Sequence, residues 1–198
     1  MHFHQELLVK ADSAKGAKKR AEGFLGPHGD NGTGVFDYYV IGGRWEGAHD
    51  AVDDLVKPAT EKVAKRLAAD KAPDIFSYKD NPELFLAQIK SMLDSRNATL
   101  VEAKEGLLHF AKKTGMSMED ILDFPRWGKS TMGEGPDMKI SMVGYNFRKA
   151  SKILSDSYCT NSYFWDVENE TGYFSKETLE EIEKEPGAWW LVTVDLHN

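Results

Sequence analysis

Hydrophobic and polar residues alternate at the two ends of the chain, and this alternation predicts a β-strand over residues 2–10 and another over residues 189–196. Successive side chains of a strand point to opposite faces, so each segment presents one apolar face. The apolar positions on these faces are Phe3, Leu7, Val9, Val192, Val194 and Leu196. Leu8 breaks the alternation of the first strand, so the second face is only partly polar.

Apolar residues at helical spacing and residues that cap helices predict the elements between these strands. Asp12 or Ser13 caps a helix that runs to Leu25, and a second strand covers residues 35–41. Pro82 is well suited to the first position of a later helix. Further helices are predicted over residues 51–69, 82–95, 99–113, 117–122, 145–155 and 175–184, with a hairpin over residues 162–174.

The order of these elements predicts the fold class. Without the helical residues 47–144, the order is strand, helix, strand, helix, hairpin, helix and strand. This order favours an α+β fold with a ferredoxin-like antiparallel sheet and helices on one face. We therefore predict a single domain over residues 1–198, with an α+β core of residues 1–46 and 145–198 and a helical insertion over residues 47–144. In this arrangement the last strand pairs antiparallel with the first.

The polar faces of the first and last strands hold candidate acid–base residues. If the strands pair as predicted, His2 and His4 lie beside Asp195 and His197 on the uncovered face of the sheet. Three histidines and a carboxylate at two-residue spacing can bind a metal ion such as zinc, or act as general acid and base. Polar residues on an uncovered sheet face are also ordinary, so these interpretations stay open, and no metal is assigned.

An aromatic strand that runs into a glycine pair, an arginine and a tryptophan is the strongest candidate for a binding site. Glycine lets the backbone approach a ligand closely, and arginine grips phosphate or carboxylate with two hydrogen bonds. This pattern favours a flat, anionic ligand. The candidate ligand-binding residues are Tyr38, Tyr39, Gly42, Gly43, Arg44, Trp45, Trp190, Asp195 and His197. Alternatively, the aromatic residues belong to the core, the glycines form a turn, and Arg44 stacks on Trp45 or pairs with a surface carboxylate.

Composition limits the class of protein. The chain of 198 residues has a net charge of −7, which argues against binding along a nucleic-acid backbone. It has no long apolar run and no signal-peptide pattern. Its single cysteine, Cys159, fits a reducing compartment, so a cytoplasmic location is expected. No phosphate loop, nucleophile elbow or paired-cysteine motif is complete, and no cofactor is expected.

Two segments resemble a group of small uncharacterised phage and bacterial proteins. Residues 37–47 carry an aromatic pair followed by Ile-Gly-Gly-Arg-Trp, and the chain closes on an Asp195-Leu196-His197 pattern. The resemblance covers the first 47 residues and the last ten. It implies a phage or mobile-element origin and a location in the host cytoplasm, but no settled activity. Small phage proteins often neutralise host defences by binding a protein or sequestering a nucleotide messenger.

Three functions follow, in order of preference. The first is a small-ligand-binding protein, such as a phage-encoded sponge that sequesters a nucleotide-like anionic signal against host defence. The second is a protein-interaction module or inhibitor that binds a host protein through the helical insertion. The third is a metal-dependent phosphoester hydrolase that uses His2, His4, Asp195 and His197. Enzyme activity is thus not favoured, and an uncovered sheet face favours a homo-oligomer.

Overall fold

The computed structural model describes two compact units. The described residues are 2–30, 32–45, 74–123, 143, 146–148, 150–160 and 162–198. One unit comprises Met1–Asp94 and Tyr158–Asn198, and we call it the sheet unit; the other comprises Ser95–Ser157, and we call it the helical unit. The helix predicted over residues 51–69 lies outside the described residues.

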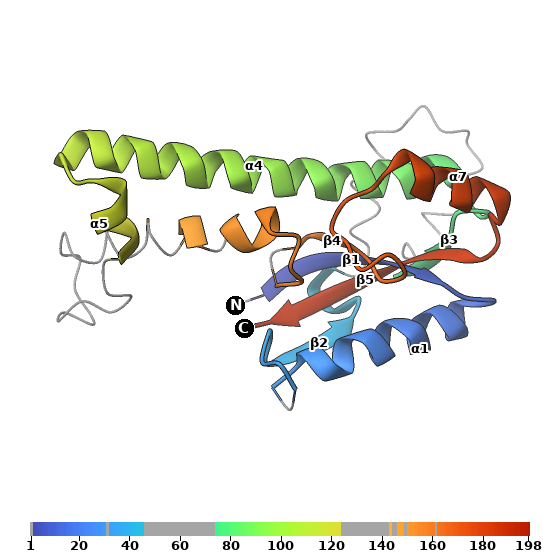
Figure 1. Cartoon of the computed structure of the whole chain (residues 1–198). Helices are drawn as coiled ribbons and strands as arrows, with labels where there is room; N and C mark the ends of the chain where they lie inside the picture. Colours follow the sequence, from blue (N-terminus) through green and yellow to red (C-terminus); the bar gives the residue numbers. More distant parts are fainter. Residues whose placement is uncertain are drawn as a thin grey trace. The chain divides into compact units, whose positions relative to one another are not determined.

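The sheet unit is built on a mixed, five-stranded sheet (Figure 1). Its strands are β1 (His2–Lys10), β2 (Tyr38–Ile41), β3 (Ile75–Ser77), β4 (Phe164–Asp166) and β5 (Trp189–His197). The order across the sheet is β2-β5-β1-β4, and β3 also pairs with β5. The predicted α+β class is confirmed.

The sheet is not wholly antiparallel, because β1 and β4 run parallel. The predicted hairpin around residues 168–172 is reduced to one isolated bridge, between Asp166 and Thr171. β4 therefore takes β1 as its main partner instead of a strand that follows it in sequence. β3 is also new, since the sequence predicted only helices in that part of the chain.

The first and last strands pair antiparallel along their full lengths, as predicted. The register runs from His2 opposite His197 to Lys10 opposite Trp189 without a break. The two ends of the described chain thus form the centre of the sheet, and their polar side chains share one face.

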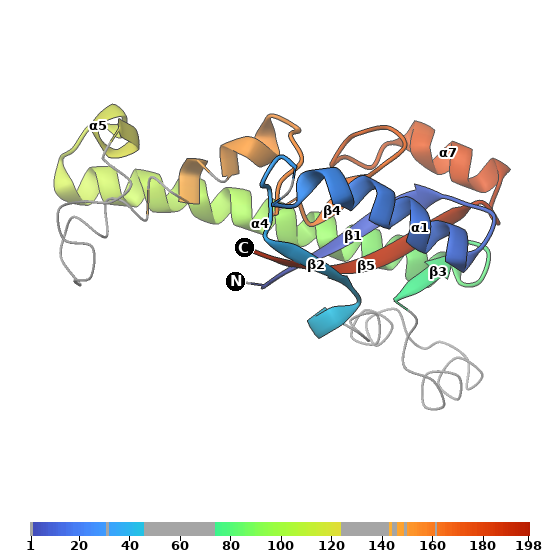
Figure 2. The same ribbon diagram turned by 90° about the horizontal axis from the view of Figure 1, so that it is seen from below.

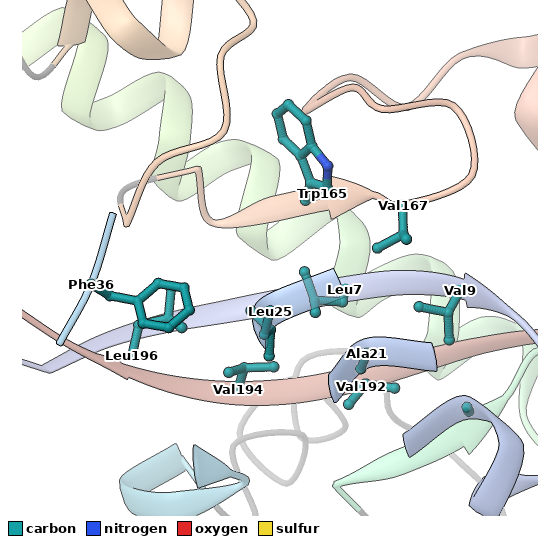
Figure 3. Close-up of a cluster of buried hydrophobic side chains, with 11 residues drawn as sticks. Leu7, Val9, Ala21, Leu25, Phe36, Trp165, Val167, Val192, Val194 and Leu196 are labelled. Carbon is teal, nitrogen blue, oxygen red and sulfur yellow. The ribbon is translucent and has the colours of Figure 1, made fainter. Parts of the chain in front are cut away.

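Helix α1 (Ala14–Leu25) covers one face of the sheet. Ser13 begins it by accepting a hydrogen bond from the Gly16 N–H at 3.2 Å. Alternate residues of the strands and one stripe of α1 form the core beneath it, and Figure 3 shows these side chains meeting. This core contains Leu7, Val9, Ala17, Ala21, Leu25, Phe36, Trp165, Val167, Val192, Val194 and Leu196.

The opposite face is also covered by helices over half of its length, so the prediction of helices on one face is wrong. α7 (Lys176–Lys184) and the first turns of α4 (Pro82–Thr114) pack there, while α1 lies across the sheet (Figures 1 and 2). The physical reason is that Leu8 and Leu191 are apolar residues on this face and need cover. Their cluster contains Leu8, Phe76, Leu84, Phe85, Ile89, Met92, Phe164, Ile182, Trp189 and Leu191.

The helical unit contains the second part of α4 and helix α5 (Met118–Asp123). α4 is continuous, whereas the sequence predicted two helices with a break after Ser95. No proline or glycine stands between Ser95 and Thr99, so nothing in the backbone chemistry ends the helix there. Leu107 and Ile121 form the buried centre of this unit.

Within the described residues, no helix is both long enough and apolar enough to cross a membrane.

Two neighbouring leucines test whether both faces of the sheet are covered. Leu7 and Leu8 are fully buried, one on each face. We expect Leu7→Ala and Leu8→Ala each to lower the free energy of unfolding by about 2–5 kcal/mol, because each removes core contacts and leaves a cavity. Urea denaturation measures both. A cost for Leu7→Ala with none for Leu8→Ala would contradict the second core, and the exposed Val101→Ala serves as control.

A histidine after α1 makes stability depend on pH. The His28 ring lies 4.8 Å from Phe24 and 4.7 Å from Tyr158, measured between ring centroids, and partial burial lowers the pKa of His28 below its usual 6.5. The folded state therefore binds fewer protons than the unfolded state just below pH 6.5, and its stability falls as the pH falls.

We expect His28→Gln to reduce the loss of stability between pH 7 and pH 5, because this substitution removes the titrating group. Urea denaturation at each pH measures the loss in both proteins. The exposed His109→Gln is the matched control and should leave the loss unchanged. Equal pH dependence in the parent and His28→Gln would contradict the assignment.

Candidate functional site

Three histidines gather at one end of the sheet, on the face that α7 and α4 leave polar. His2 and His4 come from β1, and His197 comes from β5 directly opposite His2. The rings of His2 and His197 meet edge to face, with 5.0 Å between their centroids. We call these three residues the histidine cluster. The predicted juxtaposition of His2 and His4 with Asp195 and His197 is confirmed.

Each histidine of the cluster is hydrogen-bonded to a carboxylate. The pairs are His2 Nδ1 with Asp195 Oδ1 at 2.9 Å, His4 Nε2 with Glu6 Oε1 at 2.8 Å, and His197 Nδ1 with Asp37 Oδ2 at 2.9 Å. The three carboxylates differ in how far their side chains are exposed: the exposed fraction is 5% for Asp195 and 0% for Glu6 but 48% for Asp37. The first two histidines are therefore oriented from inside the protein, and the third belongs to a surface pair.

Gly43 brings the backbone against Asp195, and Gly42 brings it against Asp74. Gly42 and Gly43 both have positive φ, 74° and 60°, which glycine adopts without strain. A Cβ atom on Gly43 would lie 2.6 Å from the Asp195 Cβ. The next residue, Arg44, donates its main-chain N–H to Asp195 Oδ2 at 3.1 Å. In the described structure the glycines thus allow a turn that orients the aspartate.

Glu6 is held by side chains that sequence reasoning did not identify. Besides His4, its Oε1 accepts hydrogen bonds from Gln88 Nε2 at 2.9 Å and from Thr193 Oγ1 at 2.8 Å. Thr193 lies directly opposite Glu6 on β5, and Gln88 comes from the first turns of α4. The only signal in the sequence is a glutamine between apolar positions of an amphipathic helix, which is a weak one.

Two aromatic rings stack on the cluster. The Tyr38 ring is stacked on His197, with 4.6 Å between centroids and 10° between planes, and Trp45 is stacked on His4 at 5.1 Å and 12°. The short helix η2 (Gly43–Trp45) carries Trp45 to this position. Tyr38 is 48% exposed, so one face of this patch is open to a planar ligand.

Tyr39 and Trp190, by contrast, lie on the opposite face of the sheet. Both pack against the core beneath α1, and the Trp190 indole donates to the Ala11 carbonyl oxygen at 2.9 Å. Tyr39 was a candidate because it belongs to the aromatic pair before the glycines, and Trp190 because one ring of the Trp189–Trp190 pair must point outward. Side chains alternate along a strand, however, so Tyr39 faces away from Tyr38, and Trp190 faces away from Asp195.

The Arg44 side chain is exposed at the edge of the cluster. Within the described residues it makes no ion pair, so its guanidinium group is available to an anion from solution. Its main chain lies one hydrogen bond from Asp195. The Gly42–Trp45 turn therefore places Arg44, whose side chain is available, next to Asp195, the carboxylate that orients His2.

The described side chains do not form a metal site, since no group of three or more His, Cys, Asp and Glu residues among them is arranged to hold a metal ion. Comparison of the chain with protein-family models, curated proteins and solved structures gives no significant match. The geometry of the histidine cluster is therefore the basis on which a function can be inferred.

Alanine substitutions at Gly34 and Gly43 test whether the turn requires a glycine because its backbone lies close to Asp195. Gly34 and Gly43 have similar positive φ, 65° and 60°, but a Cβ atom on Gly34 would meet nothing within 4 Å. Replacement by alanine costs roughly 1–2 kcal/mol at either position from the backbone alone. We expect Gly43→Ala to cost roughly 1–3 kcal/mol more, because the new methyl group overlaps Asp195. Urea denaturation measures the difference, and equal costs would show that the turn tolerates the methyl group.

Proposed function

We propose that this chain binds a small anionic ligand with a planar ring, of the nucleotide class, at the histidine cluster. The observation that carries the proposal is the Gly42–Trp45 turn. Its consecutive residues Arg44 and Trp45 supply an available guanidinium group and an indole that is stacked on His4. Guanidinium groups suit phosphate oxygens, and the exposed ring of Tyr38 on the same patch suits a nucleobase.

The charges around the cluster support an anion in spite of the nearby carboxylates. Asp195 and Glu6 are buried and already accept hydrogen bonds from His2 and His4. The imidazoles therefore lie between the carboxylates and the solvent. A phosphate group at this surface meets the imidazoles of His2 and His4 before the carboxylates behind them, whereas Asp37 beside His197 is 48% exposed.

The proposed role is to bind a signal-like nucleotide. Binding alone is enough to sequester such a nucleotide, without any reaction. The protein-interaction alternative stays a prediction. Val101 and Leu108 are exposed large hydrophobic residues on α4 in the helical unit, and they are the described residues that would serve it first.

A thermal-shift and calorimetric screen tests the proposal. The probes are AMP, ADP-ribose and cyclic mono- and dinucleotides. A ligand at 100 times its dissociation constant stabilises the fold by about 2.7 kcal/mol, which gives a clear shift. We expect Arg44→Ala to weaken binding roughly 10-fold or more, because it removes a charge-assisted hydrogen bond.

Lys15→Ala is the matched control. It removes one positive charge from α1, on the other face of the sheet, and should leave the affinity unchanged. Equal weakening by the two substitutions would mean that only net charge matters. No shift with any probe would exclude nucleotide binding and leave the helical unit as the place to search for a partner.

A further inference from the structure

We propose that His2 and His4 act as a general acid–base pair that cleaves a phosphodiester bond in the ligand of the histidine cluster. This inference rests on the proposed function, because it assumes that an anionic nucleotide binds there. It goes further in assigning a reaction, the reactive atoms and the residues that orient them.

The hydrogen bonds to the carboxylates fix which ring nitrogen of each histidine remains for a ligand. His2 uses Nδ1 to bond Asp195, and His4 uses Nε2 to bond Glu6. A nitrogen that bonds a carboxylate carries a proton, so the second nitrogen holds a lone pair in the neutral ring and a proton in the charged ring. Within the described residues, His2 Nε2 and His4 Nδ1 have no hydrogen-bond partner.

The two imidazoles are more accessible to solvent than the carboxylates that they bond. The side chains of His2 and His4 are 20% and 16% exposed, against 5% for Asp195 and 0% for Glu6. Each pair thus has a buried carboxylate that orients an imidazole, with the imidazole on the solvent side. This is the arrangement in which a carboxylate supports a histidine that moves protons.

The spacing of the two histidines suits one reacting phosphorus. Residues two apart on one face of a strand stand roughly 6.6 Å apart. A general base and a general acid must each come within about 3 Å of an oxygen, on opposite sides of the phosphorus. A separation of this order leaves room for one phosphate group between the two histidines.

The step conserves atoms and protons. One histidine, neutral, takes a proton from a hydroxyl group of the ligand or from water as that oxygen forms a bond to phosphorus. The phosphorus–oxygen bond to the leaving group breaks, and the other histidine, charged, gives its proton to the leaving oxygen. The two imidazoles end with their charges exchanged, and proton transfer with solvent restores them. Arg44 is the available cation for the phosphoryl oxygens.

Three positioning contacts hold the pair in place. The Arg44 main-chain N–H fixes Asp195 behind His2. Gln88 and Thr193 fix Glu6 behind His4. Because these contacts come from β5, α4 and the glycine turn, both imidazoles are set by packed elements of the sheet unit.

The test uses the dinucleotide uridylyl-adenosine and its 2′-deoxy form, with EDTA present, and follows products by chromatography. We expect cleavage with a bell-shaped pH profile, which reports one acid and one base. His2→Ala and His4→Ala should each lower kcat/KM at least 100-fold. Asp195→Asn should lower kcat and alter the pH profile while KM changes little. Cleavage of the ribose form alone would identify the ligand hydroxyl as nucleophile, and cleavage of both would identify water.

His109→Ala is the matched control, since His109 is exposed on α4 in the helical unit. It should cleave like the parent, and urea denaturation should show that all variants fold. Equal cleavage by the parent, His2→Ala and His4→Ala would overturn the inference, because the activity would come from elsewhere. Loss of activity in EDTA would also overturn it. Binding of a nucleotide by calorimetry without cleavage would overturn the inference and leave the proposed binding function standing, whereas the absence of both would overturn the two together.

Discussion

The full-length pairing of β1 with β5 is the interaction on which the sheet unit depends. It joins the two ends of the described chain in one unbroken antiparallel ladder, and every other strand is added to one of these two. It also builds the site, because His2 and Asp195 are 193 residues apart in sequence and meet only through this register. A slip of one residue would move the histidines to the α1 face and the apolar residues away from it. Fold and site therefore share one constraint.

The face that carries the site is divided along its length. Toward one end Leu8 and Leu191 are covered by α4 and α7, and toward the other the same strands present histidines and carboxylates. Glu6 lies at the boundary, where Gln88 of α4 donates to it. The helices thus bury the apolar half and supply a polar contact where the polar half begins. The hydrophobic effect secures the sheet at one end, which leaves the other end free to hold ionisable groups.

Local patterns were enough to predict β1, α1, α7 and β5 and the antiparallel pairing of the chain ends, because alternation and capping residues such as Ser13 and Ser175 act locally. The pairing of the chain ends followed from the order of the elements, whereas the other pairings were not predictable. The parallel partner of β4, the strand β3 and the second helical layer all follow from contacts formed only after the chain has folded. The same holds for the site: His2, His4, Asp195 and His197 were grouped correctly from strand pairing, whereas Gln88 and Thr193 were missed. Tyr39 and Trp190 were included as aromatic candidates for stacking, although strand alternation places both on the face of α1.

The buried carboxylates are the strongest argument that the polar end serves a function. Removing Glu6 and Asp195 from water costs free energy that their hydrogen bonds offset only in part, and apolar residues in place of a buried ion pair often stabilise a protein. The sheet unit has two hydrophobic cores, and neither contains these carboxylates. The chain surrounds Glu6 with His4, Gln88 and Thr193 and turns Gly43 against Asp195. This is expected where orientation of the two imidazoles matters more than stability.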